Sequence, residues 1–320
     1  METINALGQK YAATIEELFE KETSKESAHK AIDETLTLLR YKSKQSPFTA
    51  ADEKEVLSRG ELMSTALMAL YLQEQGINVA LLPALEFMRT NVNGEPDTEF
   101  LSTHLREMIN GHSDAEIFLT QGFICMNSDG GIDNLQRGGS DYTASLIGAA
   151  IGADEIEIWT DIDGMHNNDP RYVEGTAPVK QLHFDEAAEL AYFGAKILHP
   201  TCVLPAKLNN IPVRLLNTMD PEAEGTLIFN ARPDHTIKAV AAKDNITAIK
   251  IKSGRMLLAY GFLRKVFEIF ENYRTPIDMI VTSEVGVSVT IDNEKNLDAI
   301  VDDLRKFGTV TVDRDMVIIC

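Results

Sequence analysis

The chain has 320 residues, enough for two domains and part of a third, and its 30 basic and 49 acidic residues give a formal net charge of −19. A surface this acidic repels nucleic-acid phosphates and anionic lipid headgroups, so we expect neither nucleic acid nor a membrane as a partner. Three widely separated cysteines without CxxC or Cys/His spacing argue against a disulfide framework or a zinc site, and they predict a reducing, cytoplasmic location.

The first part of the chain reads as helices. Apolar residues recur three and four apart over residues 4–18 and 28–39, and a third helix is expected from near Ser58 to Gly76. Residues 78–83 then predict a buried strand and residues 98–110 a further helix. Three helices before the first strand are an unusual opening for an α/β domain.

A strand, a glycine turn, a helix and a second strand follow. The apolar run 115–120 is the first strand, the sequence Arg-Gly-Gly-Ser-Asp at 137–141 opens the helix, and residues 156–160 form the second strand. Glycines let the backbone approach a ligand, and a helix N-terminus presents N–H groups and partial positive charge to an anion. The order therefore predicts a phosphate-binding βαβ unit.

The rest of the chain predicts two groups of elements separated by a polar linker. Before the linker we expect strands at 179–182, 213–217 and 226–229. We expect helices at 184–194 and in a stretch through Ala206. After it we expect strands at 246–251, 276–282, 285–291 and 309–312 and helices at 262–273 and 297–307. The second group has the order βαββαβ, which makes a small sheet with two helices on one face. Residues 316–320 read as the start of another strand.

Several polar side chains of these segments have the chemistry of a phosphate-transfer site. Arg137 can form a fork with a carboxylate or phosphate, and Ser140 or Asp141 can cap the helix, although a plain helix cap with a surface arginine explains them equally well. Lys196 and Arg171 can neutralise a transferring phosphoryl group, or each can be a surface charge.

The acidic loop at 160–164 follows a buried strand, at the edge where α/β sheets bind ligands. It does not fit a calcium loop, because Gly164 falls at the fourth position rather than the sixth. A nucleotide pocket fits better, and a solvated acidic turn is the alternative. Glu61 sits at the start of an apolar helix, where favourable interaction with the helix dipole is explanation enough. His183 and His199 lack metal-ligand spacing and are interpreted as structural.

The combination of motifs resembles one family. The matching segments run in order through the chain: GELMSTAL, MRTN, EPD, TQGFI, LQRGGSDYTA, WTDIDGMHNNDPR, EAAELAYFGAKILHP, IPV, DPEAEGTLI, KIKSGRMLLAYGFLRKVFEIF and IDMIVTSEVGVSVTID. Together they resemble aspartate kinase, of the amino-acid kinase superfamily with C-terminal ACT regulatory domains, from about Glu55 to Cys320. The resemblance implies an α/β fold: an amino-acid-kinase-like sheet sandwiched by helices, and an α+β ACT domain. The implied organisation is a catalytic domain at 1–229, a linker at 230–243, an ACT domain at 244–314 and the first strand of a second ACT domain at 315–320.

The family phosphorylates the side-chain carboxylate of L-aspartate with MgATP, giving 4-phospho-L-aspartate, the first step towards lysine, threonine, methionine and diaminopimelate. The resemblance implies catalytic roles for Asp141 and Lys196. It implies an aspartate site formed by Glu61, Phe123, Arg137 and Ser140. It implies an ATP site formed by Thr160, Asp161, His166, Arg171, Lys196 and Ile197. His166 stands where some relatives carry tyrosine. Mg²⁺ would be held mainly by the ATP phosphates, so no protein metal site is expected.

The ACT part implies an amino-acid effector, lysine or threonine, bound where ACT domains pair, and hence a homo-oligomer. The implied effector contacts are Met256, Phe262, Leu263, Asp278, Ser283, Glu284 and Val285. Asp278 or Glu284 would meet the effector amine. The alternative is that these residues simply pack an ACT dimer.

The chain departs from the family at its start, because the strand with K-F-G-G-T-S, whose lysine contacts the transferring phosphate, is not found. We therefore expect this polypeptide alone to be inactive or nearly so. Two alternatives stay open: a non-catalytic amino-acid-sensing subunit, and the kinase half of a bifunctional aspartokinase–homoserine dehydrogenase. Glutamate and acetylglutamate kinases fit less well, because of the ACT module and the WTDIDG loop.

Overall fold

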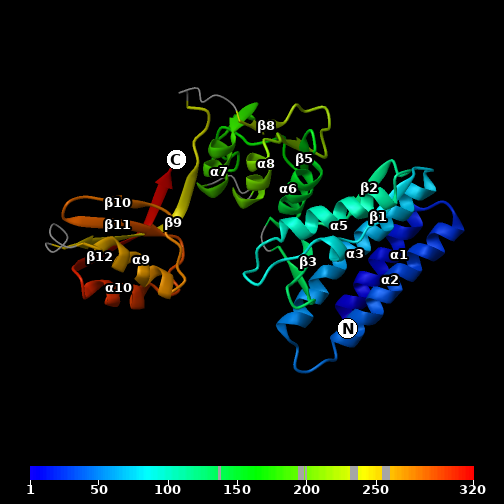
Figure 1. The fold of residues 1–320 in the computed structure, drawn as a ribbon, viewed down its shortest axis with the longest axis horizontal. Helices are drawn as coiled ribbons and strands as arrows, with labels where there is room; N and C mark the ends of the chain where they lie inside the picture. Colours follow the sequence, from blue (N-terminus) through cyan, green and yellow to red (C-terminus); the bar gives the residue numbers. More distant parts are fainter. Residues whose placement is uncertain (136–137, 194–197, 199, 231–236, 254–259) are drawn as a thin grey trace. The chain divides into compact units, whose positions relative to one another are not determined.

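A computed structural model of the chain describes residues 1–135, 138–193, 198, 200–230, 237–253 and 260–320. It divides into two compact units (Figure 1). The first unit comprises residues 1–165, 178–191 and 196–235, and the second comprises residues 166–177, 192–195 and 236–320. The expected boundary at residue 229 lies near this division, but two short earlier segments cluster with the second unit. None of the helices in the described ranges is long and apolar enough to cross a bilayer.

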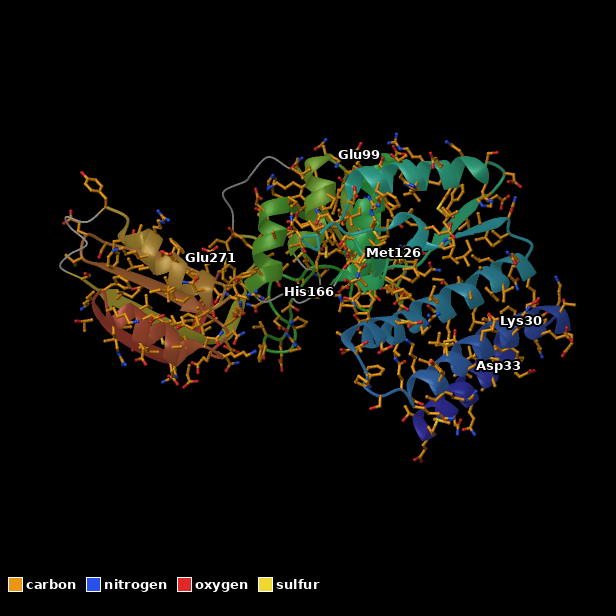
Figure 2. The ribbon with its side chains drawn as sticks, turned by 60° about the horizontal axis from the view of Figure 1, so that its bottom comes forward. Lys30, Asp33, Glu99, Met126, His166 and Glu271 are labelled. Atoms are coloured by element: carbon orange, nitrogen blue, oxygen red, sulfur yellow. The ribbon has the colours of Figure 1, made fainter. Side chains whose placement is uncertain are left out.

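Three long helices open the first unit: α1 (Glu2–Leu18), α2 (Glu22–Lys42) and α3 (Ala50–Glu74). Their apolar faces form one buried cluster, which includes Ile15, Ile32 and Leu67. On α2 the exposed Lys30 and Asp33 lie near the buried Ile32, which is the alternation that the sequence pattern predicted (Figure 2). The first two helices are confirmed.

The third helix begins at Ala50, eight residues before the predicted start at Ser58. Thr49 forms a capping box with Asp52: the Asp52 amide donates to Thr49 Oγ1 at 3.2 Å, and the Thr49 amide donates to Asp52 Oδ2 at 2.9 Å. The first turns of α3 are polar (ADEKE), so they lack the three- and four-residue spacing of apolar residues that predicts a helix. The predicted start was therefore wrong because a cap, rather than periodicity, sets it.

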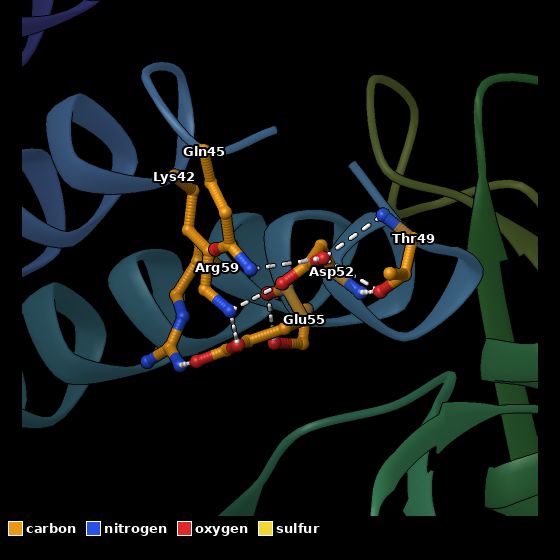
Figure 3. A network of polar contacts seen from close by, with 7 residues as sticks. Lys42, Gln45, Thr49, Asp52, Glu55 and Arg59 are labelled. Atoms are coloured by element: carbon orange, nitrogen blue, oxygen red, sulfur yellow. Dashed lines mark hydrogen bonds and ion pairs between the residues drawn. The ribbon is translucent and has the colours of Figure 1, made fainter. Parts of the chain in front are cut away.

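Charged side chains tie the start of α3 to the end of α2 (Figure 3). Lys42 Nζ lies 2.6 Å from both Asp52 Oδ1 and Glu55 Oε2, and Arg59 Nη2 lies 2.9 Å from Glu55 Oε1. Hydrogen bonds from Lys42 and then from Thr49 lower the pKa of Asp52 to about 2. At neutral pH this carboxylate is fully ionised, so it acts both as a cap and as an ion-pair partner.

The next elements build a second core around a parallel strand pair. Strand β1 (Val79–Leu82) pairs with β2 (Ile117–Thr120). The short α4 (Ala84–Phe87) and α5 (Thr98–Gly111) lie between the two strands in the sequence. Their buried side chains, among them Leu82, Phe87, Leu101 and Leu105, pack with Leu146 of α6 (Gly139–Ile151). Between β2 and α6 the structure adds an unpredicted hairpin, β3 (Ile124–Met126) and β4 (Ile132–Asn134).

A four-stranded sheet completes the first unit, in the order β5-β7-β8-β6. Its strands are β5 (Ile156–Thr160), β6 (Gln181–His183), β7 (Val213–Asn217) and β8 (Thr226–Phe229). Strand β5 runs parallel to β7, and β8 is antiparallel to β7 and parallel to β6. The connecting helices are α7 (Phe184–Phe193), η1 (Pro200–Val203) and α8 (Leu204–Leu208). The described strands of this unit thus form separate ladders rather than one continuous sheet.

The second unit has the predicted order βαββαβ. Its elements are β9 (Ala242–Lys252), α9 (Phe262–Asn272), β10 (Ile280–Thr282), β11 (Gly286–Ile291), α10 (Leu297–Arg305) and β12 (Thr309–Ile319). The sheet is antiparallel in the order β10-β11-β9-β12, and both helices cover one face (Figure 1). Ile249, Val289, Phe270 and Leu304 are central members of its core.

The C-terminal strand differs from the prediction of two short strands. Residues 309–319 form the single strand β12, which stays paired with β9 as far as Ile319 opposite Ala242. A register shift between Asp313 and Met316, with Asp315 at a φ of 55°, marks the point where the sequence pattern appeared broken. Strand β10 is also shorter than expected and begins at Ile280. The assignment of residues 315–320 to a following domain stays a prediction.

We expect Thr49→Ala to lower the free energy of unfolding by about 1 kcal/mol, because it removes the side chain that caps α3. The matched control is Thr14→Ala, at an exposed position inside α1 whose hydroxyl bonds only the preceding helical turn at Lys10 O. Urea unfolding measured by circular dichroism compares the two. Equal stability of both variants would contradict the capping box as the determinant of the α3 start.

Candidate functional site

The glycine turn lies where two backbone segments touch. Gly138 caps α6 with a φ of 70°, in the left-handed region that favours glycine. A Cβ on Gly139 would lie 2.8 Å from Phe123 Cδ2 and 3.2 Å from Phe123 Cα. A Cβ on Gly122 would lie 3.0 Å from Ser140 Cβ and 3.1 Å from Ser140 Cα. One glycine in each segment, Gly122 and Gly139, therefore lets the end of β2 approach the first turn of α6 closely.

Phe123 adopts a φ of 67°, which is uncommon for a bulky residue and carries strain. Three hydrogen bonds hold it there. Its amide donates to Thr143 Oγ1 at 3.1 Å, its carbonyl accepts from the Leu135 amide at 2.8 Å, and Thr143 Oγ1 donates to Gly139 O at 2.7 Å. Such over-determined strain is typical of ligand sites. The resemblance alone pointed to Phe123, because no sequence pattern signals its backbone angle.

Ser140 and Asp141 occupy the first turn of α6. Ser140 is exposed and Asp141 is partly buried. Burial raises the pKa of the Asp141 carboxyl, because it penalises the charged form. A carboxylate in this setting gains from a neighbouring cation, and the start of the helix also favours its negative charge.

A buried chain of hydrogen bonds connects α3 to the same place. Gln121 is 2% exposed, and its Oε1 accepts from the Ala84 amide at 2.8 Å while its Nε2 donates to Thr65 Oγ1 at 2.8 Å. Thr65 Oγ1 in turn donates to the carbonyl of Glu61 at 2.7 Å. The half-buried Glu61 is therefore fixed, through two side chains, to the residue preceding Gly122. Sequence reasoning missed Gln121 and Thr65, although an amide directly after an apolar predicted strand was a usable signal.

The acidic loop begins at the carboxyl ends of the parallel strands β5 and β7, where Thr160 lies opposite Asn217. Thr160 Oγ1 donates to Asp161 Oδ1 at 3.1 Å, and the Thr160 carbonyl accepts from Thr218 at 2.8 Å. Gly164 has a φ of 118°, and a Cβ there would come within 3.0 Å of Thr226 N. The loop is thus packed down at a strand end, as predicted for the ligand edge of an α/β sheet.

The two other predicted ATP residues in the described part of the chain belong to the second unit. His166 Nδ1 lies 3.0 Å from Thr176 Oγ1 (Figure 2 labels His166). The exposed Arg171 forms a two-pronged ion pair with Asp169, in which its Nε lies 3.0 Å from Oδ1 and 3.1 Å from Oδ2. The Arg171 guanidinium is therefore engaged within its own loop.

Arg137, Lys196, Ile197 and Met256 lie outside the described residues. The segment that follows Lys196 does reach the glycine turn: Leu198 is buried, and Cys202 Sγ donates to Gly138 O at 3.1 Å. Helix η1 therefore lies against the N-terminus of α6.

The described residues contain no group of three or more His, Cys, Asp or Glu placed to hold a metal ion. Burial raises the pKa of the Cys125 thiol to about 12, so this cysteine is a protonated core residue at neutral pH.

The predicted effector residues of the second unit fall into three settings. Phe262 is buried in the core at the start of α9, whereas Leu263 beside it is 38% exposed. Ser283, Glu284 and Val285 form the exposed turn between β10 and β11, closed by a 2.8 Å bond from the Ser283 amide to Gly286 O.

Asp278 differs from these exposed positions, because its side chain is only 2% exposed and is already bound by other residues of the second unit. Its carboxylate is therefore part of the unit's internal structure.

Comparison with known proteins gives consistent results. A model of the amino acid kinase family matches residues 8–217. Lysine-sensitive aspartokinase 3 of Escherichia coli is 39% identical over 242 residues, which are 74% of this chain and 54% of that protein. Aspartokinase 1 of Arabidopsis thaliana chloroplasts is 36% identical over 299 residues, 88% of this chain and 52% of that protein. The chain thus spans about half the length of these relatives.

A solved structure of Escherichia coli aspartokinase III in complex with aspartate and ADP superimposes with a TM-score of 0.82 at 32% identity. The match covers 99% of this chain and 73% of that one. The same enzyme in complex with lysine and aspartate gives a TM-score of 0.75.

We expect Gly122→Ala to destabilise the protein by about 1–3 kcal/mol, because the new methyl group would press on the backbone of Ser140. Gly60→Ala is the control, since this exposed glycine lies inside α3 and a Cβ there would meet no described atom within 4 Å. Alanine favours the helix at Gly60, so the control is expected to match or exceed the wild type. Thermal unfolding distinguishes the two, and a Gly122→Ala protein as stable as Gly60→Ala would show that the two segments do not need this close approach.

Proposed function

The chain belongs to the amino acid kinase family, and on that premise we propose that the protein is an aspartate kinase. It transfers the γ-phosphoryl group of ATP to the side-chain carboxylate of L-aspartate, giving 4-phospho-L-aspartate. The observation that carries the proposal is the contact between the strained Phe123 turn and the first turn of α6, because it builds an anion-binding surface beside Ser140 and Asp141. The aspartate and ADP bound to the Escherichia coli relative support the choice of substrates.

In the proposed aspartate site, Glu61 pairs with the substrate ammonium and Arg137 forms a fork with a substrate carboxylate. Ser140 Oγ and the main chain at Phe123 hold the remaining oxygens. The Gln121–Thr65 chain supports this role for Glu61, because it fixes α3 to the strand end that carries the glycine turn. The substrate ammonium therefore meets the negative charge of Glu61, and the substrate carboxylate meets the positive charge of Arg137, on separate elements.

The proposed chemistry is positioning and charge neutralisation, because the substrate supplies its own carboxylate as the nucleophile. Asp141 orients Lys196, which clamps the transferring phosphoryl group, and the desolvated setting of Asp141 supports its pairing with a lysine. Thr160, Asp161, His166, Arg171 and Ile197 complete the ATP site. Bound Mg²⁺ would neutralise phosphate charge, and it is held mainly by the phosphates.

The second unit is proposed to sense an amino-acid end product, with lysine favoured over threonine. The lysine-sensitive Escherichia coli relative and its complex with lysine support this choice. Among the described residues of the predicted effector site, the turn at Ser283–Val285 and Leu263 are exposed to solvent. Pairing of such units makes the protein a homo-oligomer, working in the cytoplasm.

The test of this function is an assay of the protein expressed from its natural gene. It measures ADP release that depends on L-aspartate, and hydroxylamine traps the acyl phosphate as a hydroxamate. We expect Glu61→Gln to raise the KM for aspartate by about 10- to 100-fold, because it removes a charge-assisted hydrogen bond. We expect Asp141→Asn instead to lower kcat. Glu99→Gln, at an exposed position of α5 (Figure 2), is the control and leaves both constants unchanged.

Two results would contradict the proposal. Wild-type protein that binds lysine but releases no ADP with aspartate would point to a sensing subunit. Wild-type protein that phosphorylates glutamate or acetylglutamate better than aspartate would point to another member of the family.

A further inference from the structure

An ion pair in the first unit joins helix α3 to the hairpin β3–β4. Lys54 Nζ lies 2.7 Å from Asp133 Oδ1, with 39% of the Lys54 side chain and 20% of the Asp133 side chain exposed. The same Asp133 oxygen accepts the Asn134 amide at 2.7 Å. The Lys54–Asp133 pair therefore bridges two elements that are distant in the sequence.

The pair lies beside a buried thiol. Cys125 of β3 stands directly opposite Asp133 in the hairpin, so both side chains point to the same face, and Cys125 is fully buried. Burial, followed by the charge of Asp133, raises the pKa of the Cys125 thiol to about 12, and the charge of Lys54 acts in the opposite direction. Asp133 thus points inward, and the Lys54 ammonium compensates its charge there.

The hairpin begins and ends at the strained Phe123 turn. Strand β3 starts at Ile124, whose amide donates to Gly122 O at 2.7 Å. The Leu135 amide, directly after β4, donates to Phe123 O at 2.8 Å. A shift of the hairpin is therefore transmitted to the main chain at Phe123 from both of its ends.

Lys54 and Glu61 lie on one face of α3, because seven residues make about two turns of a helix. Ser58, between them, is 1% exposed. Thr65 belongs to the same face one turn further on, where its hydroxyl accepts from Gln121 Nε2 at 2.8 Å. This face of α3 is therefore attached to neighbouring segments on both sides of Glu61.

Under the proposed function, the spacing between Glu61 and Phe123 sets the length of the amino acid that fits. The substrate ammonium meets Glu61, and substrate carboxylate oxygens meet the Phe123 main chain and Ser140. L-aspartate and L-glutamate carry the same charges and differ by one methylene group, so this spacing distinguishes them. One methylene group changes kcat/KM by about 10- to 200-fold in a fitted pocket.

We propose that Lys54 is a positioning residue that sets the preference of the site for aspartate over glutamate. Its ion pair with Asp133 holds the hairpin against α3 and thereby fixes the Phe123 main chain relative to Glu61. Without this pair the hairpin shifts more freely, and the site admits the longer amino acid. The inference rests on the proposed aspartate kinase function.

The test is Lys54→Met, which removes the ammonium and keeps most of the aliphatic stem. The matched control is Lys25→Met, because Lys25 Nζ lies 2.6 Å from Glu16 Oε2 in an ion pair between α2 and α1. We expect Lys54→Met to lower the ratio of kcat/KM for L-aspartate to kcat/KM for L-glutamate by about fivefold, in line with the loss of one partly exposed ion pair. The KM for ATP should stay unchanged, because the hairpin contributes no residue to the proposed ATP site.

Two further variants separate positioning from general destabilisation. Lys54→Arg keeps the positive charge and should keep the wild-type ratio. Asp133→Asn removes the charge of the other partner, so its effect on the ratio should not add to that of Lys54→Met in the double variant. Additive effects, or a Lys54→Met enzyme with the same ratio as Lys25→Met, would overturn the proposal.

Amide hydrogen exchange tests the Lys54–Asp133 pair without an activity assay. We expect the Leu135 amide to exchange faster in Lys54→Met than in the wild type, and at the wild-type rate in Lys25→Met. Unchanged exchange at Leu135 would refute the hold of the pair on the hairpin. A wild-type protein without aspartate-dependent ADP release would instead refute the kinase function, and with it the role in substrate preference, whatever the exchange shows.

Discussion

The close approach of two backbones at Gly122–Phe123 and Gly139–Ser140 is the constraint on which the first unit depends. In each contact a glycine of one segment faces a side-chain-bearing residue of the other, and a Cβ on that glycine would crowd it, so the end of β2 and the start of α6 approach closely because the glycine has none. The surrounding elements attach to this contact. Gln121 and Thr65 bring α3 to it, the β3–β4 hairpin holds Phe123 through Leu135, and Cys202 brings η1 to Gly138. The result is a helix N-terminus with its first turn presented beside a strained main chain.

Under the proposed function, that arrangement serves two tasks of a carboxylate kinase. Binding an amino acid requires opposite charges held on different elements, and transferring a phosphoryl group requires cations brought to one point. In the first unit a buried hydrogen-bond chain through Gln121 and Thr65 holds the backbone of Glu61. In the second unit the buried Asp278 carboxylate is paired with Lys243 of β9.

Much of the fold could be predicted from periodicity, because α1, α2, α5, β5, β7 and the βαββαβ unit carry regular apolar patterns. The errors have specific physical causes. The polar first turns of α3 hid a helix whose start is set by the Thr49 cap, and a register shift near Asp315 made one strand look like two. Glu61 and Phe123 could be reached only by resemblance, because their roles depend on contacts between distant segments. Gln121 and Thr65 were missed for the same reason.

The central claim is that aspartate binds where the Phe123 turn meets α6, and amide chemical shifts of the ¹⁵N-labelled protein test it most directly. Titration with L-aspartate should shift the amides of Phe123, Ser140 and Asp141 with one common saturation curve, because the ligand's carboxylate replaces water at the helix N-terminus. Amides of α1 and of α10 should stay in place. Saturating shifts confined to other segments, or no shifts at millimolar aspartate, would contradict the account.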